Sequence, residues 1–88
     1  MGYTNLWRYR RLVRQSPEFI ILRYLHSHSV YWFTVDELAA IWNVDPHAIA
    51  LDLSALILDG LVKSRQGDYK ISEQGIYWYR SACQTLGL

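Results

Sequence analysis

The sequence is short of several features that mark particular classes of protein. Its single cysteine, Cys83, cannot form an internal disulfide, so a disulfide-stapled secreted scaffold is excluded. No stretch approaches the roughly 18 consecutive apolar residues of a membrane span. No apolar segment stands ahead of a small-residue cleavage site, so we expect no signal peptide. These absences predict a cytoplasmic protein without membrane contact.

Residue groupings typical of catalysis, cofactors or metals are also missing. The five glycines are scattered, which leaves no Gly-rich loop for a phosphate-bearing cofactor. His26 and His28 would point about 200° apart on a helix, and His47 belongs to another segment. Cys83 has no histidine at a recognisable spacing. We therefore predict no enzymatic activity, no cofactor and no metal site.

Positive charge is missing from the middle of the chain. Residues 24–62 contain no Lys or Arg but five acidic residues. Residues 1–23 carry five arginines and one glutamate, and residues 63–88 carry four basic and two acidic residues. The net charge of +1 therefore averages local net charges of +4, −5 and +2. Any polyanion would have to be held by the two ends of the chain.

What is present indicates one small domain over residues 16–88, preceded by an arm or helix over residues 1–15. Hydrophobic residues make up 51% of the 88 residues, and aromatic residues make up 15%. Three helix starts can be recognised from a capping side chain followed by a proline or a glutamate. They are Ser16-Pro17, the capping box Thr34-Val35-Asp36-Glu37 and Asp45-Pro46. We expect the third of these helices to end at Asp59-Gly60.

After Gly60 the apolar period changes from 3.6 to 2. Residues 61–65 and 69–71 flank the turn Gln66-Gly67-Asp68, which predicts a β-hairpin. Residues 31–33 are a further short strand candidate. Ser72 is expected to cap a last helix, residues 73–86, with Ile76, Tyr79, Ala82 or Cys83, and Leu86 on its inner side.

This order of elements resembles the winged helix-turn-helix domain of prokaryotic and viral transcription regulators of the MarR-like and PadR-like kind. The resemblance covers residues 16 to about 80. Its most specific parts are Thr34-Val35-Asp36-Glu37-Leu38-Ala39, Asp45-Pro46-His47-Ala48-Ile49 and Tyr69-Lys70-Ile71-Ser72-Glu73-Gln74-Gly75. The fold it implies is α+β and mostly α, with a three-helix core, a two- or three-stranded wing sheet and a flanking terminal helix. The helix-turn-helix would span residues 34–59, and the wing would span residues 61–72.

The resemblance implies that the helix over residues 46–59 enters the major groove of double-stranded DNA. Helical geometry places Ile49, Leu53, Leu56 and Ile57 toward the core. The base-contacting candidates on the other side are His47, Ala50, Leu51 and Ser54. No Arg, Lys, Asn or Gln lies in this helix, and those side chains make the bidentate contacts to guanine and adenine. We therefore expect weak sequence discrimination.

Basic candidates for DNA contact lie on both sides of this helix in the sequence. In the wing they are Lys63, Arg65, Gln66 and Lys70, of which Lys63 and Arg65 share a strand face. In the N-terminal arm they are Arg8, Arg10, Arg11 and Arg14, which are interleaved with aromatic residues. The alternative for both groups is a solvated charged surface that serves solubility.

Apolar residues in excess of one core predict an assembly surface. Ala48, Leu51, Ala55 and Leu58 form a second apolar stripe on the helix over residues 46–59, and exposing two leucines forgoes roughly 1.5–3 kcal/mol each. The interface candidates are Trp7, Leu51, Leu58, Tyr77 and Trp78. The alternative is that exposed leucines are ordinary surface residues.

Two functional hypotheses result. The first is a small transcriptional regulator of a prokaryote or phage that forms a homodimer and binds double-stranded DNA. The second is a winged-helix module that binds a protein, or a second copy of itself, through the outer apolar face of the helix over residues 46–59.

Overall fold

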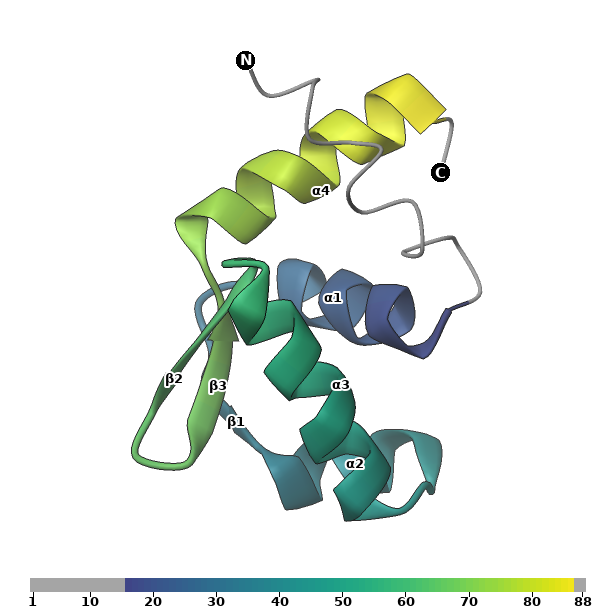
Figure 1. Ribbon diagram of the computed structural model, residues 1–88, viewed down its shortest axis with the longest axis vertical. Helices are drawn as coiled ribbons and strands as arrows, with labels where there is room; N and C mark the ends of the chain where they lie inside the picture. The colour runs from purple at the N-terminus through teal and green to yellow at the C-terminus, as the bar shows by residue number, and fades with distance from the viewer. Residues whose placement is uncertain (1–15, 87–88) are drawn as a thin grey trace.

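The computed structural model describes residues 16–86, which form four helices and one small antiparallel sheet. The elements are α1 (Pro17–Ser27), β1 (Phe33–Thr34), α2 (Val35–Trp42), α3 (Pro46–Leu58), β2 (Val62–Arg65), β3 (Asp68–Ile71) and α4 (Glu73–Leu86). In Figure 1, α4 lies beside α1 at one end of the molecule, α2 lies at the other end, and the β2–β3 hairpin extends to one side. The predicted α+β and mostly helical class is confirmed.

Two helices begin at a proline preceded by a capping side chain, as the sequence predicts. The Ser16 hydroxyl accepts a hydrogen bond from the backbone N–H of Phe19 (3.1 Å), and Pro17 opens α1. The Asp45 carboxylate accepts one from the N–H of His47 (2.9 Å), directly before the proline that opens α3. Each cap satisfies an amide that has no partner within its own helix.

The other two helices begin at side chains that also tie elements together. In the predicted capping box, Thr34 Oγ1 accepts from the N–H of Glu37 (3.1 Å), and Glu37 Oε1 accepts from the N–H of Thr34 (2.8 Å). The Ser72 hydroxyl accepts from the N–H of Gly75 (2.9 Å) and donates to the carbonyl of Gly60 (2.6 Å). Ser72 therefore links the start of α4 to the end of α3.

The end of α3 follows the prediction to within one residue. The helix ends at Leu58 and has Asp59 as its C-cap. Gly60 follows with a φ of 79°, a conformation that favours glycine. The N–H of Leu61 then donates to the carbonyl of Leu56 (2.9 Å), which closes the last turn and directs the chain into β2.

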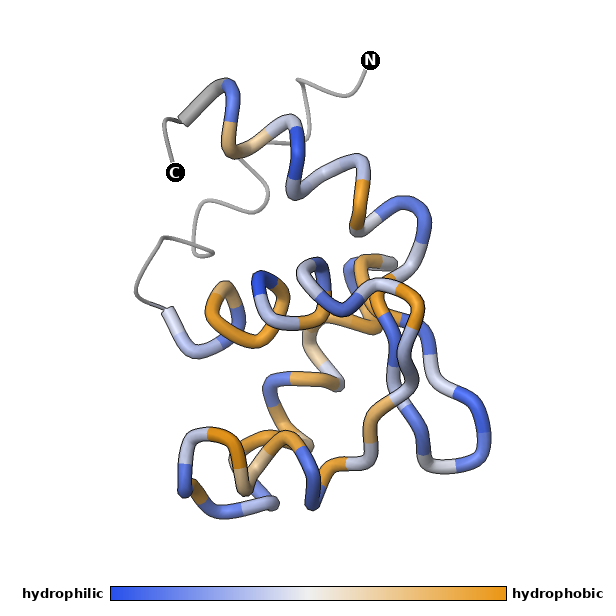
Figure 2. The backbone as a smooth tube through the Cα atoms, turned by 180° about the vertical axis from the view of Figure 1, so that it is seen from behind, coloured by the Kyte–Doolittle hydropathy of each residue, from blue (hydrophilic) through white to orange (hydrophobic). Residues whose placement is uncertain are grey.

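The three strands lie in the order β1-β3-β2. The candidate strand over residues 31–33 forms only from Phe33, and it continues into Thr34. The hairpin turn is shorter than predicted, because Asp68 already pairs with Arg65. Its two turn residues both have positive φ, 53° and 87°, which is typical of a type I′ hairpin turn. The hairpin changes from hydrophobic at its base to hydrophilic at its tip (Figure 2).

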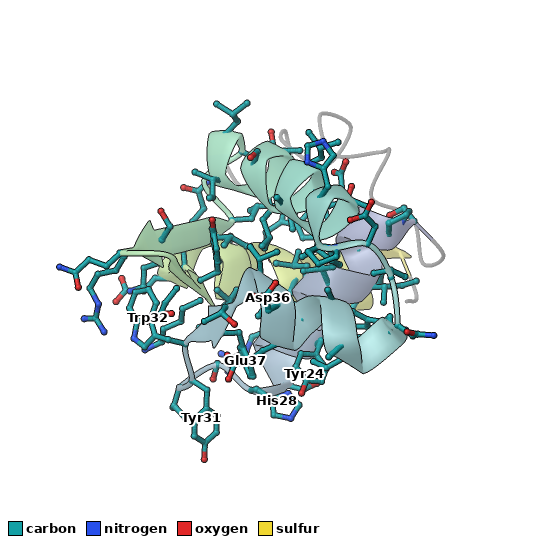
Figure 3. The ribbon with its side chains drawn as sticks, turned by 90° about the horizontal axis from the view of Figure 1, so that it is seen from below. Tyr24, His28, Tyr31, Trp32, Asp36 and Glu37 are labelled. Atoms are coloured by element: carbon teal, nitrogen blue, oxygen red, sulfur yellow. The ribbon has the colours of Figure 1, made fainter. Side chains whose placement is uncertain are left out.

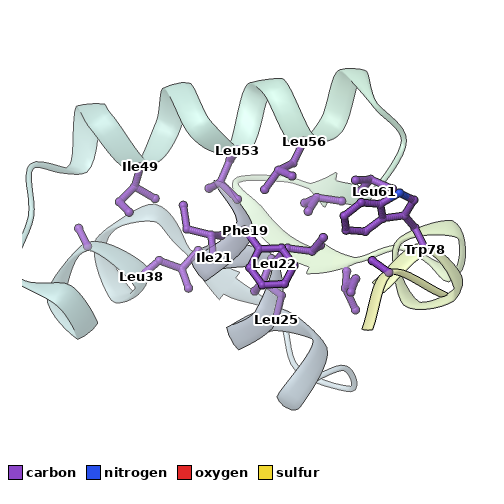
Figure 4. Packing of buried hydrophobic residues seen from close by; sticks show 14 residues of the cluster. Phe19, Ile21, Leu22, Leu25, Leu38, Ile49, Leu53, Leu56, Leu61 and Trp78 are labelled. Atoms are coloured by element: carbon purple, nitrogen blue, oxygen red, sulfur yellow. The ribbon is translucent and has the colours of Figure 1, made fainter. Parts of the chain in front are cut away.

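The core lies between α1, α3 and the inner face of the sheet (Figure 4). Phe19 and Leu22 of α1 and Leu53 and Leu56 of α3 are buried, as helical spacing predicts. Full burial of such side chains contributes roughly 1.5–3 kcal/mol each. These contacts fix the direction of α3 and therefore the side that it turns to solvent.

The line of residues that the last helix turns inward matches the prediction at Ala82 but not at the two positions before it. The expected inner residues Ile76 and Tyr79 are only half-buried, whereas Gly75, Trp78 and Ala82 are buried at spacings of three and four. A Cβ atom on Gly75 would run into the backbone carbonyl of the residue that precedes β2. The absence of a side chain at Gly75 is what allows this close approach, and it sets the rotation of α4.

This rotation overturns one predicted interface residue. Trp78 was expected at an interface, but only 5% of its surface is exposed, and its ring packs edge-on against Phe19 with 6.5 Å between the ring centres. Tyr77, the neighbouring candidate, is 63% exposed. The expectation for Trp78 is wrong, because the contact at Gly75 turns it into the core and leaves Tyr77 outside.

Candidate nucleic-acid interface

The outer face of the sheet brings together residues from separate parts of the sequence. Phe33 lies opposite Tyr69 in the β1–β3 pairing, which aligns the preceding Trp32 with Lys70. Lys70 in turn lies opposite Lys63 on β2. Because successive side chains alternate between the two faces of a strand, Trp32, Lys70 and Lys63 share the face that points away from the core.

Trp32 is at the centre of a cluster that we call the basic sheet face, consisting of Trp32, Lys63, Arg65 and Lys70. The guanidinium carbon of Arg65 lies 4.2 Å from the centre of the Trp32 ring. The ammonium nitrogens of Lys70 and Lys63 lie 5.5 Å and 5.9 Å from it. All three cations are within the roughly 6 Å at which a cation is attracted to an aromatic face. In Figure 3, Trp32 lies beside the hairpin.

The positive charge of this cluster is only partly offset by neighbouring side chains of the described residues, because Asp68 lies directly opposite Arg65 across the hairpin. Within residues 16–86, none of the three cations forms an ion pair with a carboxylate. Asp68 is the one acidic residue of the hairpin over residues 61–72. Lys63 and Lys70 also lie directly opposite each other, an arrangement in which like charges repel. An anion placed over this face would relieve that repulsion.

The outer face of α3 is chemically different. His47 and Leu51 are exposed, as predicted, but Ala50 is half-buried. The hydroxyl of Ser54 donates to the carbonyl of Ala50 (2.9 Å), so it is engaged within its own helix. With Leu51 61% and Leu58 83% exposed, this face is predominantly apolar.

The basic sheet face and the outer face of α3 lie on different sides of the domain. The inner face of the sheet carries Val62 and Ile71, which are buried in the same core as Leu53 and Leu56 of α3. The outer sides of the two elements therefore point away from each other. In Figure 3, α3 runs along the upper side, and Trp32 lies on the lower side.

The remaining predicted basic residues cannot be placed in this arrangement. Arg8, Arg10, Arg11 and Arg14 lie outside the described residues, and so does the interface candidate Trp7. Gln66 is exposed at the hairpin tip beside the basic sheet face.

His26 and His28 pack against aromatic rings. His28 stacks on Tyr24 with 4.2 Å between ring centres, and its Nδ1 lies 2.9 Å from the Tyr24 carbonyl. His26 packs against Tyr79 at 4.4 Å. Burial, together with the charge of Arg80, lowers the pKa of His26. No set of three potential metal ligands occurs in residues 16–86, and no helix in that range is long and apolar enough to cross a membrane.

A pocket of about 320 Å³ opens between α1, α2 and α3. Its lining is apolar apart from one carboxylate and includes Ile20, Ile21, Trp42, Ala48 and Asp52. Burial raises the pKa of Asp52. The pocket shares no residue with the basic sheet face.

Sequence reasoning identified the three cations of the basic sheet face but missed Trp32. The alternation of the hairpin strands placed Lys63 and Arg65 together, whereas Trp32 was assigned to a strand candidate. Its position beside the cations depends on β1 pairing with β3, a contact between segments about 36 residues apart. The one available signal was a tryptophan directly before a short strand whose core-facing residue is Phe33.

Comparison with known proteins gives no relative: no family model, no curated protein and no solved structure matches this chain.

Proposed function

We propose that this chain is a winged-helix protein that binds double-stranded DNA and acts as a small transcriptional regulator with weak sequence discrimination. The order of helices and strands, with β1 at the edge of the hairpin, supports a winged-helix arrangement. In it, α2 and α3 are the helix-turn-helix, and β2 and β3 are the wing.

The observation that carries the proposal is the basic sheet face. Lys63, Arg65 and Lys70 surround one tryptophan ring and have no carboxylate partner within residues 16–86. Cations that neutralise phosphates release condensed counterions, and this release supplies most of the affinity of sequence-independent DNA binding. Three such cations on one face are sufficient for weak to moderate binding at low salt.

The helix α3 contributes little to the proposed binding. Its segment carries Asp45, Asp52 and Asp59 and no cation, so it repels phosphate. Few of its outward side chains can form hydrogen bonds to base edges, because Ser54 already donates to its own helix. The affinity is therefore expected to depend on phosphate contacts by the sheet and to vary little with DNA sequence.

Fluorescence anisotropy with two labelled duplexes of unrelated sequence tests the proposal. We expect binding of similar affinity to both duplexes, and Lys63→Ala and Arg65→Ala should each flatten the slope of log K against log salt by about 0.9. Arg80→Ala removes the same charge from an exposed position on α4 and is the matched control. The proposal is refuted if micromolar protein does not bind either duplex in low salt, or if Arg80→Ala flattens the salt slope as much as Lys63→Ala and Arg65→Ala do.

A second candidate function is self-association or protein binding through the outer face of α3. Leu51 and Leu58 are the observation that favours it, because an apolar surface of this kind gains free energy when a partner covers it. We expect the double variant Leu51→Asp, Leu58→Asp to convert a dimer to a monomer in size-exclusion chromatography with light scattering. Its circular dichroism spectrum should keep the helical signal. A monomer before and after the change, with no partner retained in a pull-down, would remove this candidate.

A further inference from the structure

The ring of Trp32 has a specific part in the proposed DNA binding, and this inference rests on the proposed function. We propose that the basic sheet face is a binding site for phosphate groups in which Trp32 acts as a positioning residue. The ring holds Lys63, Arg65 and Lys70 together and does not stack on a nucleobase. The ligand class is thus a chain of phosphates, whatever bases it carries.

The like charges of this face need a group that holds them together. Lys63 and Lys70 are direct cross-strand partners, and Arg65 is two residues along the same strand face as Lys63. Asp68 lies opposite Arg65 and offsets part of the repulsion among the three cations, but their long side chains could still extend into solvent in different directions. The negative face of an indole ring attracts all three, which explains why they converge on Trp32.

This convergence prepares the site for an anion. Side chains that are already gathered lose less conformational freedom when they bind than side chains that must be collected from solvent. An arginine guanidinium and two ammonium groups gathered beside one ring offer donors to the oxygen atoms of one or two adjacent phosphates. Trp32 therefore increases affinity without contacting the phosphate itself.

The same geometry argues against stacking of a base on Trp32. The guanidinium carbon of Arg65 lies 4.2 Å from the ring centre, so Arg65 occupies a face on which a base would stack. Trp32 is also half-buried beside the sheet. A base stacked on the face that Arg65 covers would displace Arg65, which would separate the cations that attract the phosphate.

The first test asks whether phosphate alone is recognised. A labelled DNA duplex is bound to the full chain, and linear inorganic polyphosphate and single-stranded oligonucleotides of different base composition are added as competitors. We expect polyphosphate to displace the duplex at phosphate concentrations within about tenfold of those needed for the oligonucleotides. The inference is overturned in favour of stacking if polyphosphate does not compete and if the strength of competition by the oligonucleotides depends strongly on their base composition.

The second test asks whether Trp32 positions the cations. Trp32→Leu should weaken duplex binding by roughly tenfold and leave the slope of log K against log salt unchanged, because the three charges remain. Trp32→Phe retains an aromatic face and should bind within about threefold of the unaltered protein. Tyr77→Leu removes another exposed aromatic residue, on α4, and should have no effect.

The outcomes separate this inference from the proposed function. If the unaltered chain binds neither duplex nor polyphosphate, the proposed function fails and the inference fails with it. If Lys63→Ala and Arg65→Ala weaken binding but Trp32→Leu does not, only the role of Trp32 is wrong. A flattened salt slope in Trp32→Leu also contradicts that role. If circular dichroism shows that Trp32→Leu does not fold, the polyphosphate competition and Trp32→Phe decide the question.

Discussion

The close contact between α4 and the start of β2 makes Gly75→Ala an informative substitution. Helix propensity alone predicts that this change stabilises the protein by about 1 kcal/mol, because alanine is the better helix former. The structure predicts the opposite. A Cβ atom on Gly75 would collide with the carbonyl oxygen of Leu61 and would lie 2.8 Å from Cγ1 of Ile71.

The loss in free energy of unfolding caused by Gly75→Ala can be estimated from the groups that would have to move. The Leu61 carbonyl oxygen belongs to the backbone and accepts a hydrogen bond from the N–H of Ser72 (3.0 Å), so relief requires α4 to shift as a whole. Overpacking of this kind costs about 1–3 kcal/mol. Weakening the hydrogen bonds of Ser72 to Leu61 and to Gly60 adds about 0.5–1.5 kcal/mol for each bond. After subtraction of the helix-propensity gain, we expect a net loss of about 3 kcal/mol.

Thermal and urea unfolding followed by circular dichroism measure this loss. A loss of about 3 kcal/mol corresponds to a decrease in Tm of roughly 12–24 °C for a domain of this size. Gly67→Ala is the matched control, because Gly67 has no atom within 4 Å of a Cβ and only its φ of 87° opposes the change. The control should lose only about 1 kcal/mol. A Gly75→Ala protein as stable as the parent would refute the close approach of α4.

Three further predictions concern one helix cap and two half-buried titratable groups. Thr34→Ala removes one half of the capping box with Glu37 and should cost about 1 kcal/mol in urea unfolding, whereas Thr34→Ser should cost much less. Burial and the charge of Arg80 lower the pKa of His26 below its ordinary value of 6.5, so the unfolded chain takes up a proton first. Stability should therefore fall as the pH decreases from 6.5 through the lowered pKa, and a His26→Gln protein that loses just as much stability in that window would contradict this assignment. Burial raises the pKa of Asp52 above 3.8, so the folded protein binds that proton more tightly and loses stability as the pH rises through the raised pKa. Asp52→Asn should then have a higher Tm than the parent near neutral pH and no advantage below pH 3.8, and an unchanged Tm near neutral pH would show that the charge is well solvated.

Local sequence signals predicted those parts of the fold that depend on a single segment of the chain. The caps at Ser16, Thr34, Asp45 and Ser72 need only a side-chain oxygen and an amide within three residues, and all four form. The core direction of α3 also follows from spacing alone, although that helix is apolar on two sides. The α+β class could therefore be predicted from the sequence.

Contacts between distant segments could not be predicted in the same way. Tyr77, Trp78 and Tyr79 are chemically similar, and only the approach of Gly75 to Leu61 determines which ring is buried. The position of Trp32 beside the cations likewise depends on strand order, which alternation within one strand does not specify. The basic sheet face is thus half predictable: its charges follow from the sequence of the hairpin, and its aromatic centre follows from topology.

The most direct test of the account is the salt dependence of duplex binding by the unaltered protein and by the triple variant Lys63→Ala, Arg65→Ala, Lys70→Ala. If these three cations neutralise three phosphates, the slopes of log K against log salt should differ by about 2.7 between the two proteins. That difference corresponds to an additional decrease in affinity of roughly 40-fold for the unaltered protein between about 50 and 200 mM salt. Equal slopes and equal affinities, with both proteins folded, would show that DNA does not bind at the basic sheet face.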